Sequence, residues 1–181
     1  MNISQLSDDE TARTDPECAA QRAENMAILG VRNVLELCVG PSLRVLERTY
    51  AKHGITVTGN DLEMRWRQYH PRGSWLIGDA LAIDWSDFDA VVFAPPLTHG
   101  CSGRRDDALS INDVNPSYRS FMERPYSGLR CMVLPARSMA TSRDRDQLHA
   151  LLSEIDGPYD VVPLYAERRR IRKYVDVYYR R

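Results

Sequence analysis

The stretch Val34-Leu-Glu-Leu-Cys-Val-Gly-Pro-Ser42 decides the fold of this chain of 181 residues. Its apolar run has the length of a buried strand, and Gly40 and Pro41 end that strand sharply before a helical pattern begins. In an open sheet of parallel strands, ligands bind beyond the carboxyl ends of the strands. Small side chains at Cys38, Gly40 and Ser42 would let a ligand come close to the backbone there. We therefore expect a nucleotide-like cofactor at this turn.

Length and composition indicate one domain. A chain of this length with 43% hydrophobic residues can bury one core and is short for two. Residues 1–14 are polar, acidic and without periodicity, so we expect a frayed tail before a single domain at 15–181. The chain has no signal pattern and no apolar stretch near the ~18 residues of a membrane span, which favours a cytoplasmic protein without membrane contact. The scattered cysteines predict neither disulfides nor a metal site; they are Cys18, Cys38, Cys101 and Cys131.

The net charge of −1 hides a division between the two ends of the chain. Acidic residues crowd the beginning, and basic residues crowd the end. A basic cluster of this kind is a candidate contact for the phosphates of RNA or DNA, and a solvated hairpin tip is the alternative interpretation. The residues predicted to make the contact are Arg168, Arg169, Arg170, Arg172 and Lys173.

Hydrophobic periodicity and stop signals predict helices and strands in alternation. Asp15-Pro16 is typical of a helix start, and Gly54 is typical of the residue that follows a helix. The predicted helices cover residues 16–29, 42–53, 62–70, 117–123 and 141–155. The predicted strands cover residues 32–38, 55–61, 74–78, 88–93, 128–135, 159–165 and 171–179, the last two as a hairpin. This alternation predicts an α/β fold.

An acid ends the second predicted strand. Asp61 is placed to accept hydrogen bonds from both hydroxyl groups of a ribose. A dinucleotide would also need glycines in the pattern G-x-G-x-x-G, and those positions hold Cys38, Gly40 and Leu43. A phosphate-binding G-x-x-x-x-G-K-[ST] pattern occurs nowhere in the chain. The glycine spacing therefore opposes NAD while Asp61 still predicts a ribose.

The spacing Glu36-x-Cys38-x-Gly40-x-Ser42 resembles motif I of the class I S-adenosylmethionine-dependent methyltransferases, an acid followed by alternating small residues. Asp79, which follows the third strand, resembles the acid that accepts from the adenine amino group in that family. The resemblance implies a Rossmann-like fold: a seven-stranded mixed sheet with an antiparallel last strand and helices on both faces. It implies S-adenosyl-L-methionine as the cofactor. The predicted cofactor contacts are Glu36, Cys38, Gly40, Ser42, Asp61 and Asp79.

The fourth predicted strand ends in Ala94-Pro95-Pro96, which resembles the family's motif IV in its [D/N/S]-P-P-[Y/F/W] version. Enzymes with that version methylate exocyclic amines of nucleobases or amide nitrogens. Prolines stiffen the loop and remove backbone donors, so neighbouring carbonyls can accept from an amino group. Ala94 and Leu97 depart from the pattern, because they remove the side-chain acceptor and the aromatic stacking face. A plain strand terminator is the alternative interpretation.

Residues 97–127 form a connection far longer than the usual two to six residues, which favours a functional segment. We expect its first part, residues 97–107, to fold over the crevice as a lid. His99 is a candidate proton acceptor, so the predicted catalytic set is Ala94, Pro95, Pro96 and His99. Asn115-Pro116 is predicted to open the helix at 117–123. The aromatic residues available to stack on a substrate are Tyr118, Phe121 and Tyr126.

Taken together, these patterns imply an S-adenosylmethionine-dependent methyltransferase that acts on an amino group of RNA or DNA. Two alternatives stay open: a methyltransferase for a small metabolite or a protein amine, and a non-catalytic domain of the same fold that binds a partner through its basic edge. A closed, neutral surface over the crevice would favour the first alternative, and a blocked cofactor pocket would favour the second.

Overall fold

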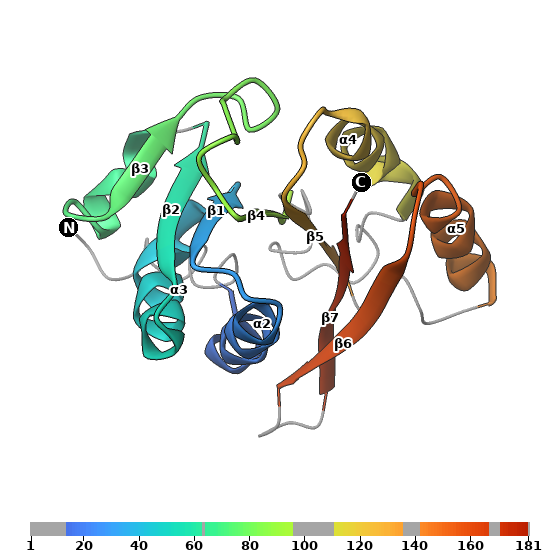
Figure 1. Ribbon diagram of the computed structural model, residues 1–181, viewed down its shortest axis with the longest axis horizontal. Helices are drawn as coiled ribbons and strands as arrows, with labels where there is room; N and C mark the ends of the chain where they lie inside the picture. The colour runs from blue at the N-terminus through green and yellow to red at the C-terminus, as the bar shows by residue number, and fades with distance from the viewer. Residues whose placement is uncertain (1–13, 63, 96–110, 136–141, 167–170, 181) are drawn as a thin grey trace, which may run out of the picture.

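The computed structural model describes residues 14–62, 64–95, 111–135, 142–166 and 171–180. Its strands form one sheet of seven in the order β3-β2-β1-β4-β5-β7-β6 (Figure 1). Strands β1 to β5 pair in parallel, and β7 runs antiparallel to both β5 and β6. The strands are β1 Asn33–Leu37, β2 Thr56–Asp61, β3 Ser74–Ile77, β4 Ala90–Phe93, β5 Leu129–Pro135, β6 Tyr159–Ala166 and β7 Ile171–Tyr179.

Helices cover both faces of this sheet (Figure 1). Helices α2 (Pro16–Ile28) and α3 (Leu43–Tyr50) pack on one face, and α4 (Ile111–Glu123) and α5 (Ser142–Leu152) pack on the other. The prediction of a Rossmann-like α/β fold with an antiparallel last strand is therefore confirmed. None of the helices in the described part of the chain is long and apolar enough to cross a membrane.

The central strands β1 and β4 are mostly apolar because both of their faces are buried. Alternate residues of β1 and β4 divide between two cores. The core under α4 and α5 takes Leu35, Leu37, Val91 and Phe93. The core under α2 and α3 takes Val34, Ala90 and Val92. This division explains why the run that begins at Val34 shows no alternation of polar and apolar residues.

Local signals place the helix ends near the predicted positions. The carboxylate of Asp15 accepts from the backbone N–H of Glu17 at 2.9 Å, and Pro16 occupies the first helical position of α2. After α3, the short 3₁₀ helix η3 (Ala51–His53) ends at Gly54, which has a φ of 69°. A second 3₁₀ helix, η2 (Gly40–Ser42), leads from the turn into α3.

Two predicted helices differ from the structure. Helix α4 begins at Ile111, so Asn115-Pro116 lies inside it and the predicted start is wrong. The apolar spacing of Ile111, Val114 and Tyr118 continues the helical stripe upstream, and this spacing outweighs the proline signal. The segment predicted as a helix at 62–70 is the 3₁₀ helix η4 (Met64–Tyr69). Thr141, the first residue of the helix predicted at 141–155, lies outside the described residues.

The crossover from β3 to β4 contains no helix, and Trp85 fills the space instead. Its side chain is 1% exposed, and its ring centroid lies 5.3 Å from that of Phe121 and 5.8 Å from that of Tyr126. The indole N–H donates to the carbonyl of Ala80 at 3.1 Å. Together with Leu81, Ile83 and Phe88, this side chain covers the core that a crossover helix usually covers.

A buried ion pair joins the first described helix to the reversed strand. Arg22 of α2 donates from Nε to Oδ2 of Asp176 at 2.6 Å and from Nη2 to Oδ1 at 3.0 Å. The two side chains are 1% and 0% exposed. The hydroxyl of Tyr178 donates to Oδ2 of the same carboxylate at 3.1 Å. This two-pronged geometry satisfies both charges where no water reaches them.

Glu36 of β1 lies in the same buried region. Its carboxylate is 2% exposed and accepts from the hydroxyl of Tyr50 at 2.6 Å. Burial raises the pKa of Glu36, although the charge of Arg22 and the hydrogen bond from Tyr50 act in the opposite direction. Strands β1 and β7 and helices α2 and α3 therefore place polar groups in one buried region.

Asp176→Asn should lower the free energy of unfolding by about 3–5 kcal/mol, because it leaves the buried guanidinium of Arg22 without a counter-charge. Urea denaturation of the variant and the wild type measures the difference. Glu154→Gln is the control: it removes an ion pair with Arg119 whose side chains are 48% and 39% exposed, and it should barely move the midpoint. Equal effects of the two substitutions would contradict the importance of the buried pair.

Glu36→Gln should change how stability depends on pH. The folded state binds the proton of Glu36 more tightly than the unfolded chain, so the wild type loses stability as pH rises from the ordinary glutamate range through the raised pKa. Glutamine keeps an acceptor for Tyr50 and does not titrate. Chemical denaturation between about pH 5 and 8 should show the free energy of unfolding of the variant rising relative to that of the wild type as pH rises. A difference that stays constant with pH would contradict the raised pKa.

Candidate active site

Three strand ends meet at the carboxyl edge of the sheet, the edge at which β1 to β5 end. The turn after β1 is joined to β2, because the N–H of Val39 donates to the carbonyl of Asn60 at 2.9 Å. The N–H of Gly40 donates to Oδ2 of Asp61 at 2.8 Å. The turn after β3 is joined to the same residue, since the N–H of Gly78 donates to the carbonyl of Asp61 at 3.1 Å. Asp61 therefore ties the three turns together.

The turn after β1 depends on left-handed backbone. Cys38 has a φ of 58° and Gly40 a φ of 52°. Among the described residues, Cys38 is the non-glycine residue with positive φ, and it stands at the first small-residue position of the spacing that resembles motif I. An L-residue in this conformation costs about 1–2 kcal/mol. The fold thus accepts local strain at the position where the sequence predicts close approach of a ligand.

Close packing of α3 against β2 also needs a missing side chain. A Cβ atom at Gly59 would lie 2.9 Å from Cγ1 of Val39 and 3.0 Å from Cδ1 of Leu43. Both contacts are with the side chains that begin the turn and the helix. Gly59 therefore lets the start of α3 sit directly against the strand that carries Asp61.

Asp61 and Asp79 surround Cys38 with negative charge. Burial raises the pKa of the Cys38 thiol to about 12, and the carboxylates of Asp61 and Asp79 add to the effect. The thiol is therefore protonated at neutral pH and acts as a small neutral group. Asp79 is exposed, and its Oδ1 accepts from the N–H of Leu81 at 2.9 Å. The structure thus brings Cys38, Asp61 and Asp79 together with Gly40, the fourth predicted cofactor residue at this turn.

The other two predicted cofactor residues lie deeper in the fold. Ser42 is 1% exposed, and its Oγ accepts from the backbone N–H of Thr14 at 2.8 Å. Glu36 points into the core under α2 and α3, where Tyr50 binds its carboxylate. Both side chains therefore have partners inside the fold, and their contact with a cofactor stays a prediction.

The acceptor side of the predicted site is described only in part. Register pairs Leu37 of β1 with Phe93 of β4, so Ala94 and Pro95 leave the sheet beside Cys38. Both residues are half-buried. Pro96, His99 and the predicted lid at 97–107 lie outside the described residues, and so do Arg168, Arg169 and Arg170. Arg172 and Lys173 lie in β7.

The aromatic residues predicted to stack on a substrate are not exposed at the carboxyl edge. Tyr118 is buried, and its hydroxyl donates to the carbonyl of Val133 at 2.6 Å. Phe121 is buried and stacks on Phe93 with ring centroids 4.9 Å apart. The hydroxyl of Tyr126 donates to the carbonyl of Phe88 at 2.8 Å. The prediction was wrong because Tyr118 and Phe121 belong to the apolar stripe with which α4 meets the sheet.

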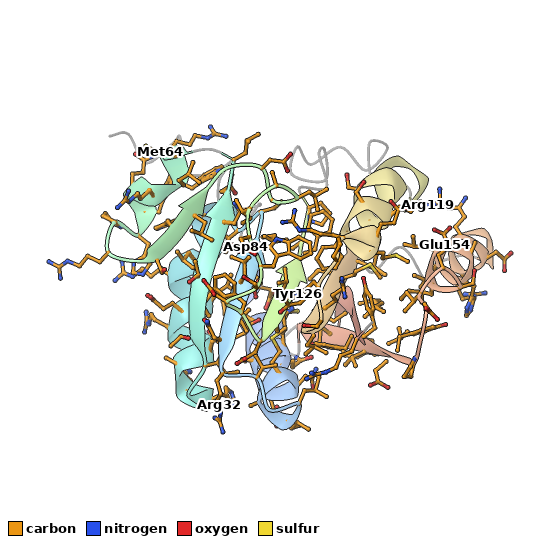
Figure 2. All side chains as sticks on the ribbon, turned by 45° about the horizontal axis from the view of Figure 1, so that its top comes forward. Arg32, Met64, Asp84, Arg119, Tyr126 and Glu154 are labelled. Atoms are coloured by element: carbon orange, nitrogen blue, oxygen red, sulfur yellow. The ribbon has the colours of Figure 1, made fainter. Side chains whose placement is uncertain are left out.

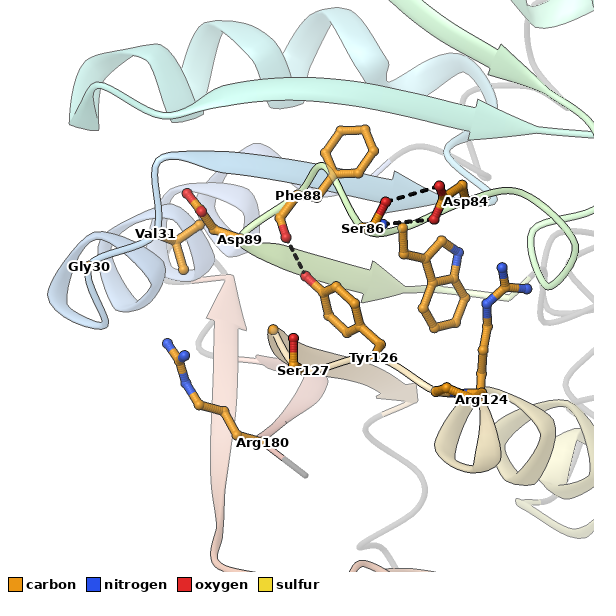
Figure 3. A pocket seen from close by; sticks show the side chains of 13 residues that line it. Gly30, Val31, Asp84, Ser86, Phe88, Asp89, Arg124, Tyr126, Ser127 and Arg180 are labelled. Atoms are coloured by element: carbon orange, nitrogen blue, oxygen red, sulfur yellow. Dashed lines mark hydrogen bonds between the residues drawn. The ribbon is translucent and has the colours of Figure 1, made fainter.

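A pocket of ≈ 470 Å³ lies at the opposite, amino edge of the sheet, where the parallel strands begin (Figure 3). Acidic and basic side chains both line it, among them Asp84, Asp89, Arg124 and Arg180. Arg124 lies over the ring of Trp85 at 4.4 Å. No sequence pattern indicated this pocket, and it is remote from the acids at the ends of β2 and β3.

Helix η4 follows Asp61 along the chain and packs against η2. Its guanidinium and aromatic groups therefore border the carboxyl edge. The sequence Arg65-Trp-Arg-Gln-Tyr69 interleaves basic and aromatic residues, which is the signal that sequence reasoning overlooked. Among the described residues, no group of three or more histidine, cysteine or acidic side chains is arranged to hold a metal ion.

Cys38→Gly should be about 1 kcal/mol more stable than Cys38→Ala, because only glycine relieves the left-handed backbone. Both variants remove the thiol, so packing losses largely cancel in the comparison. Chemical denaturation of the pair gives the difference. Equal stabilities would mean that the turn relaxes out of the left-handed region in solution.

No protein-family model matches the sequence, and no curated protein matches it by sequence. Solved structures do match its fold. The O-methyltransferase from Bacillus cereus, solved in complex with SAH, has a TM-score of 0.59 and 12% identity over 99% of this chain and 89% of its own. The methyltransferase domain of a bacterial Hen1 protein has the same TM-score of 0.59 and 12% identity, over 90% of this chain and 96% of its own.

A third structure is the 1,6-didemethyltoxoflavin-N1-methyltransferase from Burkholderia thailandensis, solved with bound 1,6-didemethyltoxoflavin and S-adenosylhomocysteine. It has a TM-score of 0.53 and 18% identity over 91% of this chain and 79% of its own. At these identities the similarity concerns the fold. The chain therefore has the fold of the S-adenosylmethionine-dependent methyltransferases.

Proposed function

We propose that the chain is an S-adenosyl-L-methionine-dependent methyltransferase. One observation carries the proposal: Asp61 and Asp79, from the ends of two neighbouring strands, converge on the left-handed turn at Cys38 and Gly40. This convergence occurs at the carboxyl edge, where α/β sheets bind ligands. Two of the similar solved structures were determined with S-adenosylhomocysteine or SAH, which supports the same cofactor for this chain.

The residues at the turn fit the parts of that cofactor. A carboxylate offers several acceptor positions, so Asp61 can hold the N–H of Gly40 and also accept from a ribose hydroxyl. Asp79 is exposed and can accept from the adenine amino group. Asn60 contributes a buried Oδ1 that has no hydrogen-bond partner among the described residues. The two carboxylates also favour the positive charge of a sulfonium.

When bound, the cofactor supplies a methyl group on positively charged sulfur. The chain itself has to hold the acceptor in line, exclude water and take up one proton. Ala94 and Pro95 follow β4 directly beside Cys38, so their carbonyl groups are candidates to hold an amino group at that place. Pro96 and His99 complete the proposed set, with His99 as the proton acceptor.

The proposed acceptor is an amino nitrogen of RNA or DNA. The resemblance of Ala94-Pro95-Pro96 to motif IV supports a nitrogen acceptor, and the arginines near the end of the chain support a partner with phosphates. Transfer of labelled methyl groups from S-adenosylmethionine to RNA, DNA, protein and metabolite fractions tests this choice. Labelling of the metabolite or protein fraction alone would favour the alternative that the methyl acceptor is a small metabolite or a protein amine.

Asp61→Ala should weaken S-adenosylmethionine binding roughly 10- to 100-fold, because hydrogen bonds to a charged group contribute about 1.5–3 kcal/mol each. Calorimetric titration measures the affinity, and NAD serves as the comparison ligand that should not bind. Asp84→Ala at the amino edge is the matched control and should bind like the wild type. Equal affinities of Asp61→Ala and the wild type would remove Asp61 from the site, and failure of the wild type to bind would overturn the proposed function.

A further inference from the structure

The segment that follows Asp61 exposes an unusual set of side chains. Residues 64–73 contain three arginines and no acidic residue, in a chain whose net charge is −1. The guanidinium groups of Arg65, Arg67 and Arg72 are exposed, whereas the rings of Trp66 and Tyr69 are half-exposed. This segment is thus locally basic, although the chain as a whole is not.

The aromatic rings and an arginine form a layered platform. The guanidinium carbon of Arg65 lies 4.4 Å from the ring centroid of Trp66. The ring centroids of Trp66 and Tyr69 are 5.8 Å apart, with 34° between the ring planes. Met64, the first residue of η4, is 64% exposed. Unstacked bases pack on aromatic rings and on guanidinium planes, whatever their sequence.

Contacts of His70 with α3 and β3 hold the platform in place. Nε2 of His70 pairs with the carboxylate of Glu47 on α3. The carbonyl of His70 accepts from the indole N–H of Trp75 at 2.9 Å and from the N–H of Gly73 at 3.0 Å. These bonds fix the segment to α3 and β3. The surface is therefore preorganised, which lowers the entropy lost when a ligand binds.

From this arrangement we infer that Arg65, Trp66, Arg67, Tyr69 and Arg72, named here the η4 platform, form a docking surface for single-stranded nucleic acid. The arginines match the charge of the phosphates, and the rings match bases that are not paired. A duplex would hide its base faces from the rings, and an acidic peptide would leave the rings without stacking partners. Because η4 packs against η2, a strand docked there lies next to the predicted cofactor turn.

This inference rests on the proposed function for one consequence only: the docked strand is the methyl acceptor. The binding itself is independent of methyl transfer. Figure 2 shows Met64 of η4 at the top of the view and Arg32 at the bottom. Arg32 is exposed and precedes β1, so Arg32→Gln serves as a control for the loss of one surface charge elsewhere.

The test is fluorescence anisotropy of labelled single-stranded U12 and dT12 with the full chain. Trp66→Leu should weaken binding roughly 5- to 150-fold, the range expected for one lost base stack. The triple variant Arg65→Gln, Arg67→Gln, Arg72→Gln should make the slope of log affinity against log salt less steep by about 2, because each single-strand phosphate contact contributes about 0.7. Arg32→Gln should bind like the wild type.

Tryptophan fluorescence gives a second readout. Binding should quench the signal, and Trp66→Leu should abolish the quenching although Trp75 and Trp85 remain. Equal binding by the platform variants and the wild type would overturn the inference. Preference for a duplex of the same length, or binding of a polyglutamate peptide in place of the oligonucleotides, would also overturn it.

Titration of the same triple variant with S-adenosylmethionine separates this inference from the proposed function. The arginines are not among the predicted cofactor residues, so the variant should keep the wild-type affinity for the cofactor. If the wild type binds oligonucleotide and no cofactor, the proposed function fails and the platform stands. If it binds cofactor and no oligonucleotide, the platform fails and the proposed function stands.

Discussion

The buried ion pair between Arg22 and Asp176 is the constraint on which the rest of this fold depends. It fastens the helix that precedes the sheet to the strand that completes it. Neither charge could stay in that place alone, because burial of an unpaired charge is far more costly than burial of a matched pair. Glu36 and Tyr50 extend the polar contacts toward α3, so the elements beneath the cofactor turn are held by charge as well as by apolar packing.

The carboxyl edge shows how a weak sequence motif can still build a site. Only Gly40 is a glycine in the motif I spacing, yet the backbone at Cys38 adopts the left-handed conformation that glycine usually provides. Gly59 supplies the close approach of α3 from the neighbouring strand. The geometry of the turn is therefore distributed over two strands, and a motif search along one of them sees only part of it.

Much of the fold could be predicted because its signals are local. Asp15-Pro16, Gly54 and the apolar runs act within a few residues, and the acids at 61 and 79 follow strands whose ends must meet in a parallel sheet. The Arg22–Asp176 pair joins positions 154 residues apart, and no local pattern announces it. The partners of Glu36 and Ser42 inside the fold could not be predicted either, because Tyr50 and Thr14 lie 14 and 28 residues away in the sequence. The start of α4 was missed because a proline signal was given more weight than the apolar spacing that continues through it.

The position of β7 has a consequence for how the chain folds. Strand β6 is synthesised first, yet β7 lies between β5 and β6 in the finished sheet. The sheet therefore cannot grow strand by strand in the order of synthesis. Strand β7 can pair with β5 only after β6 has been synthesised, either alone or as a hairpin with β6, and only then does Asp176 reach Arg22. The connection between β5 and β7 contains α5 and β6, and closing a loop of that length is entropically costly. We therefore expect completion of the sheet to be a late and slow step. Until that step, the edge of β5 is exposed to pairing with other chains.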